Sequence, residues 1–247
     1  YISGDCNIDT EFPYWNKQLI YILSHTHTAF IEQTQRLTYN KLMELTKSFP
    51  FPHPDEFKTK FFSKKYDAII LSLLTTTYRG LYINKNDGTY VEYGYANCDI
   101  TDENNWDKVL SSIPEKYKEE NRQLLKVFKE DPPVDLVLKN LAYIRKNLDS
   151  KTELILILGS EIPTQKALEG YEGMVEKHII MNRYVREFTQ KFNNISLLEL
   201  TDLIQSDDDY NECINHFSRR VYNDFAKKII HIVNNKLGKE YLQFKTL

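Results

Sequence analysis

The sequence predicts an α/β fold, a three-layer α/β/α sandwich in which helices cover both faces of a central parallel sheet of about five strands. Three observations lead to this prediction. Strand-sized and helical apolar patterns alternate along the chain, and the runs 67–74 and 153–158 are rich in aliphatic residues, as is typical of strands buried on both faces. An apolar stripe at helical spacing closes the pattern near the C-terminus. Right-handed crossovers between such strands favour a doubly wound sheet.

The first part of the chain supplies the opening strands. Apolar spacing assigns 15–23 to a helix, and the short run 1–3 leads as a strand into a glycine-containing turn. The predicted elements are, in order, a strand at 1–3, a helix at 15–23, a strand at 28–33, a helix through Leu42 and Leu45, a proline-containing loop at 50–54 and a strand at 67–74.

The last part of the chain repeats the same alternation. The predicted elements are a helix at 136–148, a strand at 153–158, a helix at 176–192, a weaker strand at 195–199 and a final helix whose apolar stripe is Phe217, Val221, Phe225, Ile229 and Val233. Together these patterns complete the strand and helix repeats of the sandwich.

The segment 81–131 does not follow this plan. A hairpin is predicted around Asn86-Asp87-Gly88, because turn residues there separate two short strand-like runs. A polar helical piece follows at 115–129. We expect one domain over 1–247 that carries 81–131 as an insertion, rather than a second domain. The strand pattern begins abruptly at residue 1, so we also expect a piece of a longer polypeptide with other domains as partners.

Composition narrows the possible functions. The formal net charge is -3, and no basic stripe of the kind that binds nucleic acid is present. The three cysteines, Cys6, Cys98 and Cys213, are far apart, which argues against a disulfide framework and favours a reducing, cytoplasmic location. No apolar run is long enough for membrane insertion. The pair His25 and His27 lacks a third ligand, and phosphate-binding glycine motifs are absent, so we predict no metal and no cofactor.

Two candidate sites follow the first two strong strands. Gly4-Asp5-Cys6 comes after the opening strand, where a thiol at a helix start would have a lowered pKa. The alternative is a small buried cysteine in a tight turn. Tyr78-Arg79-Gly80 follows the strand 67–74, and the N–H of Gly80 is a candidate oxyanion donor. The alternative is an ordinary loop glycine.

Two further candidates lie in the second half of the chain. Ser160 and Glu161 follow the strand 153–158 and are expected at the ligand crevice, unless they are only polar turn residues. His216 precedes the final helix, where an imidazole can act as a general base, and Ser218 is a candidate N-cap. The acidic residues just before it can supply a carboxylate that orients His216, although the same run suits a solvated loop. They are Asp207, Asp208, Asp209 and Glu212.

The order of these motifs resembles that of the SGNH (GDSL-like) hydrolases and acyltransferases, over nearly the whole chain except 81–131. The resemblance implies a flavodoxin-like sheet. It places Cys6 at the position of the nucleophilic serine and Gly80 at that of the second-block oxyanion-hole glycine. Glu161 falls at the position of the third-block asparagine, and His216 at that of the base.

The chain departs from the family pattern at three positions. Cys6 replaces serine, Glu161 replaces asparagine, and Cys213 stands where the aspartate before the histidine is expected. Glu212 or Asp209 can replace that acid, or the acid is unnecessary, because a thiol ionises with less help than a hydroxyl. A Glu161 carboxylate does not donate to an oxyanion unless it is protonated, so Ser160 or backbone N–H groups would serve there instead.

The resemblance implies acyl transfer to or from a carbohydrate-linked substrate. It also implies a setting for this reaction, the modification of a bacterial surface polysaccharide. Cys6 would attack a carbonyl, His216 would move the proton, and the N–H groups of Cys6 and Gly80 would hold the oxyanion. The residues expected to bind the substrate are Arg79, Ser160 and Glu161. The alternatives are an amide- or ester-forming transferase module of a larger polysaccharide-assembly protein, and a catalytically inactive domain that binds glycans or scaffolds partners.

Overall fold

The chain divides into two compact units. In the computed structural model, unit 1 comprises Tyr1–Thr26, Phe61–Thr77 and Leu141–Leu247, and unit 2 comprises His27–Lys60 and Tyr78–Asn140. The structure describes residues 2–3, 20–23, 65–74, 80–86, 90–93, 99, 101–106, 115–126, 134–165, 173–211 and 216–238. The predicted insertion, 81–131, falls within unit 2.

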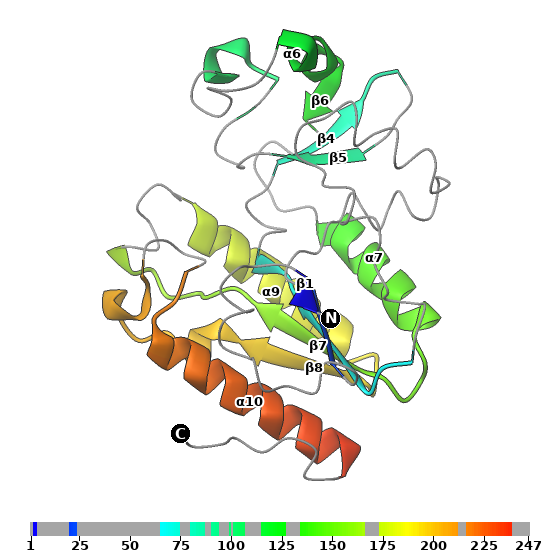
Figure 1. Cartoon of the computed structure of the whole chain (residues 1–247), viewed down its shortest axis with the longest axis vertical. Helices are drawn as coiled ribbons and strands as arrows, with labels where there is room; N and C mark the ends of the chain where they lie inside the picture. The colour runs from blue at the N-terminus through cyan, green and yellow to red at the C-terminus, as the bar shows by residue number, and fades with distance from the viewer. Residues whose placement is uncertain are drawn as a thin grey trace. The chain divides into compact units, whose positions relative to one another are not determined.

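Unit 1 is built on a parallel β-sheet (Figure 1). Its strands are β1 (Ile2–Ser3), β2 (Ile20–Leu23), β3 (Ala68–Ser72), β7 (Glu153–Leu158) and β8 (Ile195–Glu199). They pair in the order β1-β2-β3-β7-β8, and every pairing is parallel. The prediction of an α/β fold with a parallel sheet is therefore confirmed.

The core of unit 1 is the pair β3 and β7. Every side chain of both strands is buried, which explains why their sequences are aliphatic rather than alternating. Ile70 of β3 pairs with Ile22 of β2 on one side and with Ile155 of β7 on the other. The sheet is thus sealed from water where these strands meet.

Helices pack on the sheet through amphipathic faces. The helix α10 (Arg219–Leu237) and the helix α9 (Met174–Thr189) both contact β8. In Figure 1, α10 runs along one side of the β7 and β8 ribbons and α9 passes on the other. The buried residues of α10 include the predicted stripe positions Val221, Phe225, Ile229 and Val233. The helix α7 (Val134–Asn147) leads into the turn before β7.

Arg145, near the end of α7, ties that turn together. The side chain is 8% exposed, and its guanidinium donates to the carbonyl oxygens of Thr152 (2.6 Å) and Asp149. Burial lowers the pKa of Arg145, and the nearby carboxylates of Glu153 and Asp149 act in the opposite direction. These bonds fix the point at which the chain enters β7.

Two predictions for the first part of the sheet differ from the structure. Ile20–Leu23 forms the strand β2 rather than the end of a helix at 15–23, because Ile-Tyr-Ile-Leu suits a pleated strand as well as an apolar helical face. A flavodoxin-like sheet has its first strand between the second and third. Here β1 pairs with β2, which itself pairs with β3. The predicted strand at 28–33 and the helix through Leu42 and Leu45 lie outside the described residues.

Unit 2 contains a small antiparallel sheet with the order β5-β4-β6. Its elements are β4 (Gly80–Asn84), β5 (Tyr90–Tyr93), the short 3-10 helix η2 (Glu103–Asn105), α6 (Glu115–Arg122) and β6 (Leu124–Lys126). β4 pairs with β5 through Tyr82↔Val91 and Ile83↔Tyr90, so the predicted hairpin is confirmed. The predicted helix at 115–129 is wrong beyond Arg122, because Leu124–Lys126 pairs with β4 instead.

Candidate functional site

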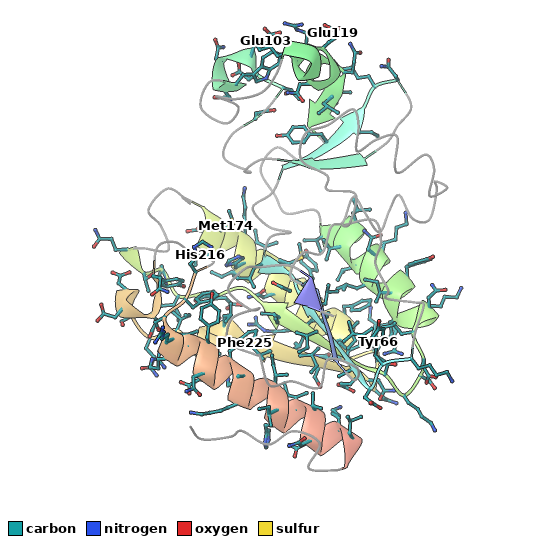
Figure 2. The ribbon with its side chains drawn as sticks, viewed as in Figure 1. Tyr66, Glu103, Glu119, Met174, His216 and Phe225 are labelled. Atoms are coloured by element: carbon teal, nitrogen blue, oxygen red, sulfur yellow. The ribbon has the colours of Figure 1, made fainter. Side chains whose placement is uncertain are left out.

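The candidate residues of unit 1 gather at one edge of the sheet. Parallel strands bring their carboxyl ends to the same edge, which we call the carboxyl edge, and ligands of open α/β sheets bind there. Figure 2 places His216 at the end of unit 1 opposite Tyr66, which lies two residues before the first residue of β3. His216 therefore lies on the side where the strands end.

The turn after β7 forms the inner wall of the carboxyl edge. Ser160 is 1% exposed, and its Oγ accepts a hydrogen bond from the Ile162 N–H (3.2 Å). The N–H of Glu161 donates to Thr201 Oγ1 (2.9 Å), in the short 3-10 helix η3 (Leu200–Asp202) that follows β8. The turn is thus bonded within itself and to the segment that follows β8.

One face of α9 holds this turn in place. His178, Asn182 and Arg186 recur every four residues and therefore share a helix face. Asn182 Nδ2 donates to the Gly159 carbonyl (2.8 Å) and to Glu161 Oε1 (2.9 Å). Arg186 Nη2 donates to the same Glu161 oxygen (2.7 Å). These partners assign the Glu161 carboxylate a structural role, and its contact with a substrate stays a prediction.

Arg186 also joins the turn to β8. Its Nε donates to Glu199 Oε1 (3.0 Å) and its Nη2 pairs with Glu199 Oε2, so one guanidinium bridges two carboxylates. The hydrogen bonds from Arg186 to Glu199 and Glu161 raise the pKa of Arg186 above its ordinary value, although partial burial opposes this. The bridge fixes the carboxyl ends of β7 and β8 relative to each other.

His178 is the most unusual group at this edge. It is 1% exposed, and Nδ1 lies 3.0 Å from the Ser160 carbonyl oxygen, to which it must donate. The ring packs so closely on Gly159 that a Cβ there would lie 2.4 Å from His178 Cγ. Within the described part of the chain, Nε2 is buried without a hydrogen-bond partner. Burial lowers the pKa of His178 to about 4, so the ring is neutral near pH 7.

The loop that carries His216 is closed at its base by backbone pairing. Tyr210 and Phe217 form an antiparallel bridge. Asn211 donates twice across the loop, from its N–H to the His216 carbonyl (2.9 Å) and from Nδ2 to the Phe217 carbonyl (2.7 Å). The Ser218 N–H donates to the Asp209 carbonyl (2.8 Å). His216 therefore sits at a defined backbone position next to the start of α10.

Asp209 stabilises this loop through its carboxylate. It accepts hydrogen bonds from the N–H groups of Gln205 (2.7 Å) and Ser206 (3.1 Å) and from Arg220 Nε (3.1 Å). Burial raises the pKa of Asp209, but these hydrogen bonds outweigh it and hold the pKa below its ordinary value. Asp209 thus orders the backbone of the loop.

Tyr210 lies between the loop and the turn after β7. Its side chain is 1% exposed, and its ring packs against Phe217 with centroids 5.7 Å apart. Burial raises the pKa of Tyr210, and the nearby Ser160 and Thr164 side chains offset part of the rise. One side chain of the loop that carries His216 therefore lies near Ser160.

The predicted site residues fall into three groups according to where they lie. Ser160, Glu161 and His216 come together at the carboxyl edge of unit 1. Gly80 was expected in a loop, but it is the first residue of β4 in unit 2 and pairs with Tyr93. Its role as an oxyanion donor stays a prediction. Cys6, Arg79 and Glu212 lie outside the described residues.

Sequence reasoning missed His178, Asn182, Arg186 and Tyr210. The first three carried a detectable signal, because polar residues at four-residue spacing inside an amphipathic helix indicate a buried polar face. Ser218 was expected as an N-cap and does occupy that position, but its side chain makes no capping hydrogen bond.

Two general features complete the description of the site. Among the described residues, no group of three or more histidine, cysteine, aspartate or glutamate side chains could hold a metal ion. None of the helices in that same part of the chain combines the length and apolarity needed to cross a bilayer.

No protein-family model and no curated protein matches the sequence.

Proposed function

We propose that the chain is an acyl-transfer enzyme of the SGNH type, a three-layer sandwich in which Cys6 is the nucleophile and His216 the base. The observation that carries the proposal is the position of His216 in a closed loop at the carboxyl edge. β1 ends at Ser3 on the same edge, and Cys6 follows three residues later. Three residues of chain span at most about 11 Å, and this short separation supports the choice of Cys6 as the nucleophile.

The proposed reaction proceeds in two steps. The imidazole of His216 takes the thiol proton, and the sulfur of Cys6 forms a bond to the acyl carbon while the carbonyl electrons move to oxygen. The backbone N–H of Cys6 stabilises that oxyanion. The leaving group departs with the proton from His216, and an acceptor hydroxyl, amine or water then attacks the thioester and regenerates the thiol.

The remaining assignments follow from the family resemblance. Glu212 would orient His216, since Asp209 is engaged with Arg220 and backbone N–H groups. Arg79 would bind the substrate, and Ser160 and Glu161 would shape the floor of its site. A carbohydrate-linked ester or acyl group is the proposed substrate, within cytoplasmic modification of a bacterial surface polysaccharide. A thioester intermediate suits transfer to an acceptor better than simple hydrolysis.

A mass measurement tests this proposal. The protein is incubated with p-nitrophenyl acetate and with the acetyl thioester of N-acetylcysteamine, and the intact mass is followed with time. We expect one acetyl adduct, which Cys6→Ala abolishes and which His216→Asn forms at least about 100-fold more slowly, in line with the loss of a general base.

The control variants are Cys98→Ala and Cys213→Ala, which should keep the wild-type adduct. Equal labelling of all three cysteines, or neither an adduct nor release of acetate with either donor, contradicts the proposal and favours an inactive binding domain. An adduct that persists until a sugar hydroxyl or an amine is added indicates a transferase. An adduct that decays at once to acetate indicates a hydrolase.

A further inference from the structure

Asn211 lies at one end of the loop that carries His216 and bonds to the other end. We infer that Asn211 is a positioning residue, whose side-chain amide sets the place of the His216 imidazole by holding the backbone that follows it. This inference rests on the proposed role of His216 as the base and names the residue that fixes the base. Asn211 is assigned no contact with the nucleophile or the acyl group.

The first support is the pair of hydrogen bonds that Asn211 donates across the loop. Its backbone N–H donates to the His216 carbonyl (2.9 Å), and its Nδ2 donates to the Phe217 carbonyl (2.7 Å). Because each peptide unit is planar, holding a carbonyl oxygen also fixes the direction of the backbone on both sides of it. One residue therefore holds the two peptide units that follow the His216 side chain.

The second support is the frame to which this loop is attached. Tyr210 and Phe217 form an antiparallel bridge at its base. Next to the bridge, Asp209 is 4% exposed, and its carboxylate pairs with Arg220 of α10, whose Nη2 also donates to the Leu203 carbonyl (2.9 Å). The base of the loop is thus joined to α10 and to the segment after β8, so a bond inside the loop fixes His216 relative to both.

The third support is the position of the Phe217 carbonyl just before α10. The hydrogen bonds of the helix begin at the Ser218 carbonyl, which accepts from the Tyr222 N–H (3.1 Å). The Phe217 carbonyl lies one residue earlier, so the helix does not supply its partner. Phe217 is 6% exposed, and a carbonyl in such a place requires a donor. The Asn211 amide supplies that donor, which a side chain without an N–H or O–H group could not do.

The test compares Asn211→Ala with the wild-type protein in two measurements. The first is acetylation of Cys6 by p-nitrophenyl acetate, followed per folded molecule over a range of donor concentrations. The second is the NMR signal of the His216 ring in protein labelled with 13C-histidine, assigned with His216→Asn.

We expect the rate constant at saturating donor to fall about 2- to 12-fold, because the net strength of one hydrogen bond changes the population of a loop conformation by about that factor. The donor concentration that gives half of this rate should stay unchanged, since the base acts on the chemical step rather than on donor binding. The His216 signal should shift.

The matched control is Asn147→Ala. Asn147 is also exposed, and its Nδ2 donates to a backbone carbonyl, that of Tyr143 in α7 (2.8 Å). This control removes the same kind of bond outside the loop of His216, and it should leave both measurements unchanged. Asn211→Leu removes the donor with a side chain of nearly the same size, and it replaces Asn211→Ala if that variant does not fold.

The outcomes separate this inference from the proposed function. If the wild-type protein is acetylated and Asn211→Ala reacts at the wild-type rate, the inference is overturned while the function stands. A lower rate with an unchanged His216 signal, or equal effects of Asn147→Ala, also overturns it. If the wild-type protein neither forms an adduct nor releases acetate, the proposed function fails and the NMR signal alone decides. An unchanged His216 signal then overturns the positioning role, and a shifted signal supports it.

Discussion

At the scale of single residues, His178 shows how burial controls charge. The ring donates a hydrogen bond to the Ser160 carbonyl, and this bond and the charge of Glu161 favour protonation less than burial opposes it. Desolvation therefore dominates and lowers the pKa of His178 to about 4. Protonation of this ring would place a charge against Gly159 inside the protein, so the neutral ring is part of the folded structure.

This burial predicts a dependence of stability on pH. The pKa of His178 is about 4 when folded and about 6.5 in the unfolded chain, so the unfolded chain binds more protons between these values. Stability then rises with pH across this window. The contribution, about 3 kcal/mol, is complete above about pH 6.5 and is lost as the pH falls towards about 4.

Urea unfolding at several pH values between 4 and 7 measures this contribution. His178→Asn keeps a donor for the Ser160 carbonyl but cannot titrate, so the free energy of unfolding should depend less steeply on pH. His231→Asn, at an exposed position of α10, is the matched control and should keep the wild-type dependence. Equal slopes for His178→Asn and the wild-type protein would show that the ring is not buried as described.

At the scale of elements, α9 packs close to the end of β7 because the residue there, Gly159, has no side chain. Gly159 has no Cβ, and the ring of His178 occupies the space that a Cβ would need, at 2.4 Å from Cγ and 2.5 Å from Nδ1. Neither partner can yield easily, since one is backbone at the end of a buried strand and the other is a buried ring. The closeness of this helix to the sheet therefore depends on glycine.

Replacement of this glycine predicts a clash that a second substitution relieves. Gly159→Ala should lower the free energy of unfolding by about 1–3 kcal/mol through overpacking. In His178→Ala the space is empty, so adding Gly159→Ala should cost much less than it does alone. Denaturant unfolding of the two single variants and the double variant measures the coupling. Additive costs would mean that the two residues do not touch.

Sequence patterns identified the elements whose burial is uniform. The aliphatic runs predict β3 and β7, and the strand at 195–199 is confirmed as β8. The failures are short apolar pieces, at 20–23 and 124–126, which are strands where helices were predicted. Four or fewer residues do not distinguish a period of 3.6 from a period of 2, and the partner strand makes the choice.

At the scale of the whole molecule, stability should depend most on the strands at the centre of the parallel sheet. Ile70 is 0% exposed and lies on β3, between β2 and β7. We expect Ile70→Ala to lower the free energy of unfolding by about 2–5 kcal/mol, through lost burial and a residual cavity. That is a large part of the 5–15 kcal/mol typical of a folded domain.

The matched control for this prediction is Ile179→Ala. Ile179 lies on α9 and is 44% exposed, so the same truncation should change the free energy of unfolding by no more than about 0.5 kcal/mol. Urea unfolding followed by circular dichroism measures both variants. Equal losses would contradict the assignment of β3 to the interior of the sheet.

The candidate site was predictable only in part for a physical reason. Residues that follow strands can be located from sequence, because parallel strands end at a common edge, and the sequence pattern therefore indicated the edge at which Ser160 and Glu161 lie. The hydrogen bonds from α9 to the turn after β7 join residues that are 18 to 25 positions apart. Such contacts depend on how helices dock, which local periodicity does not encode.

The direction of the helices has an electrostatic consequence. α9 and α10 follow β7 and β8 and begin at the edge where those strands end (Figure 1). Each helix N-terminus carries the equivalent of roughly half a positive elementary charge. Two such dipoles directed at the same region create an attractive potential for anions. A thiolate, an oxyanion or an acidic substrate that reaches this region would be stabilised by the backbone alone, before any side chain contributes.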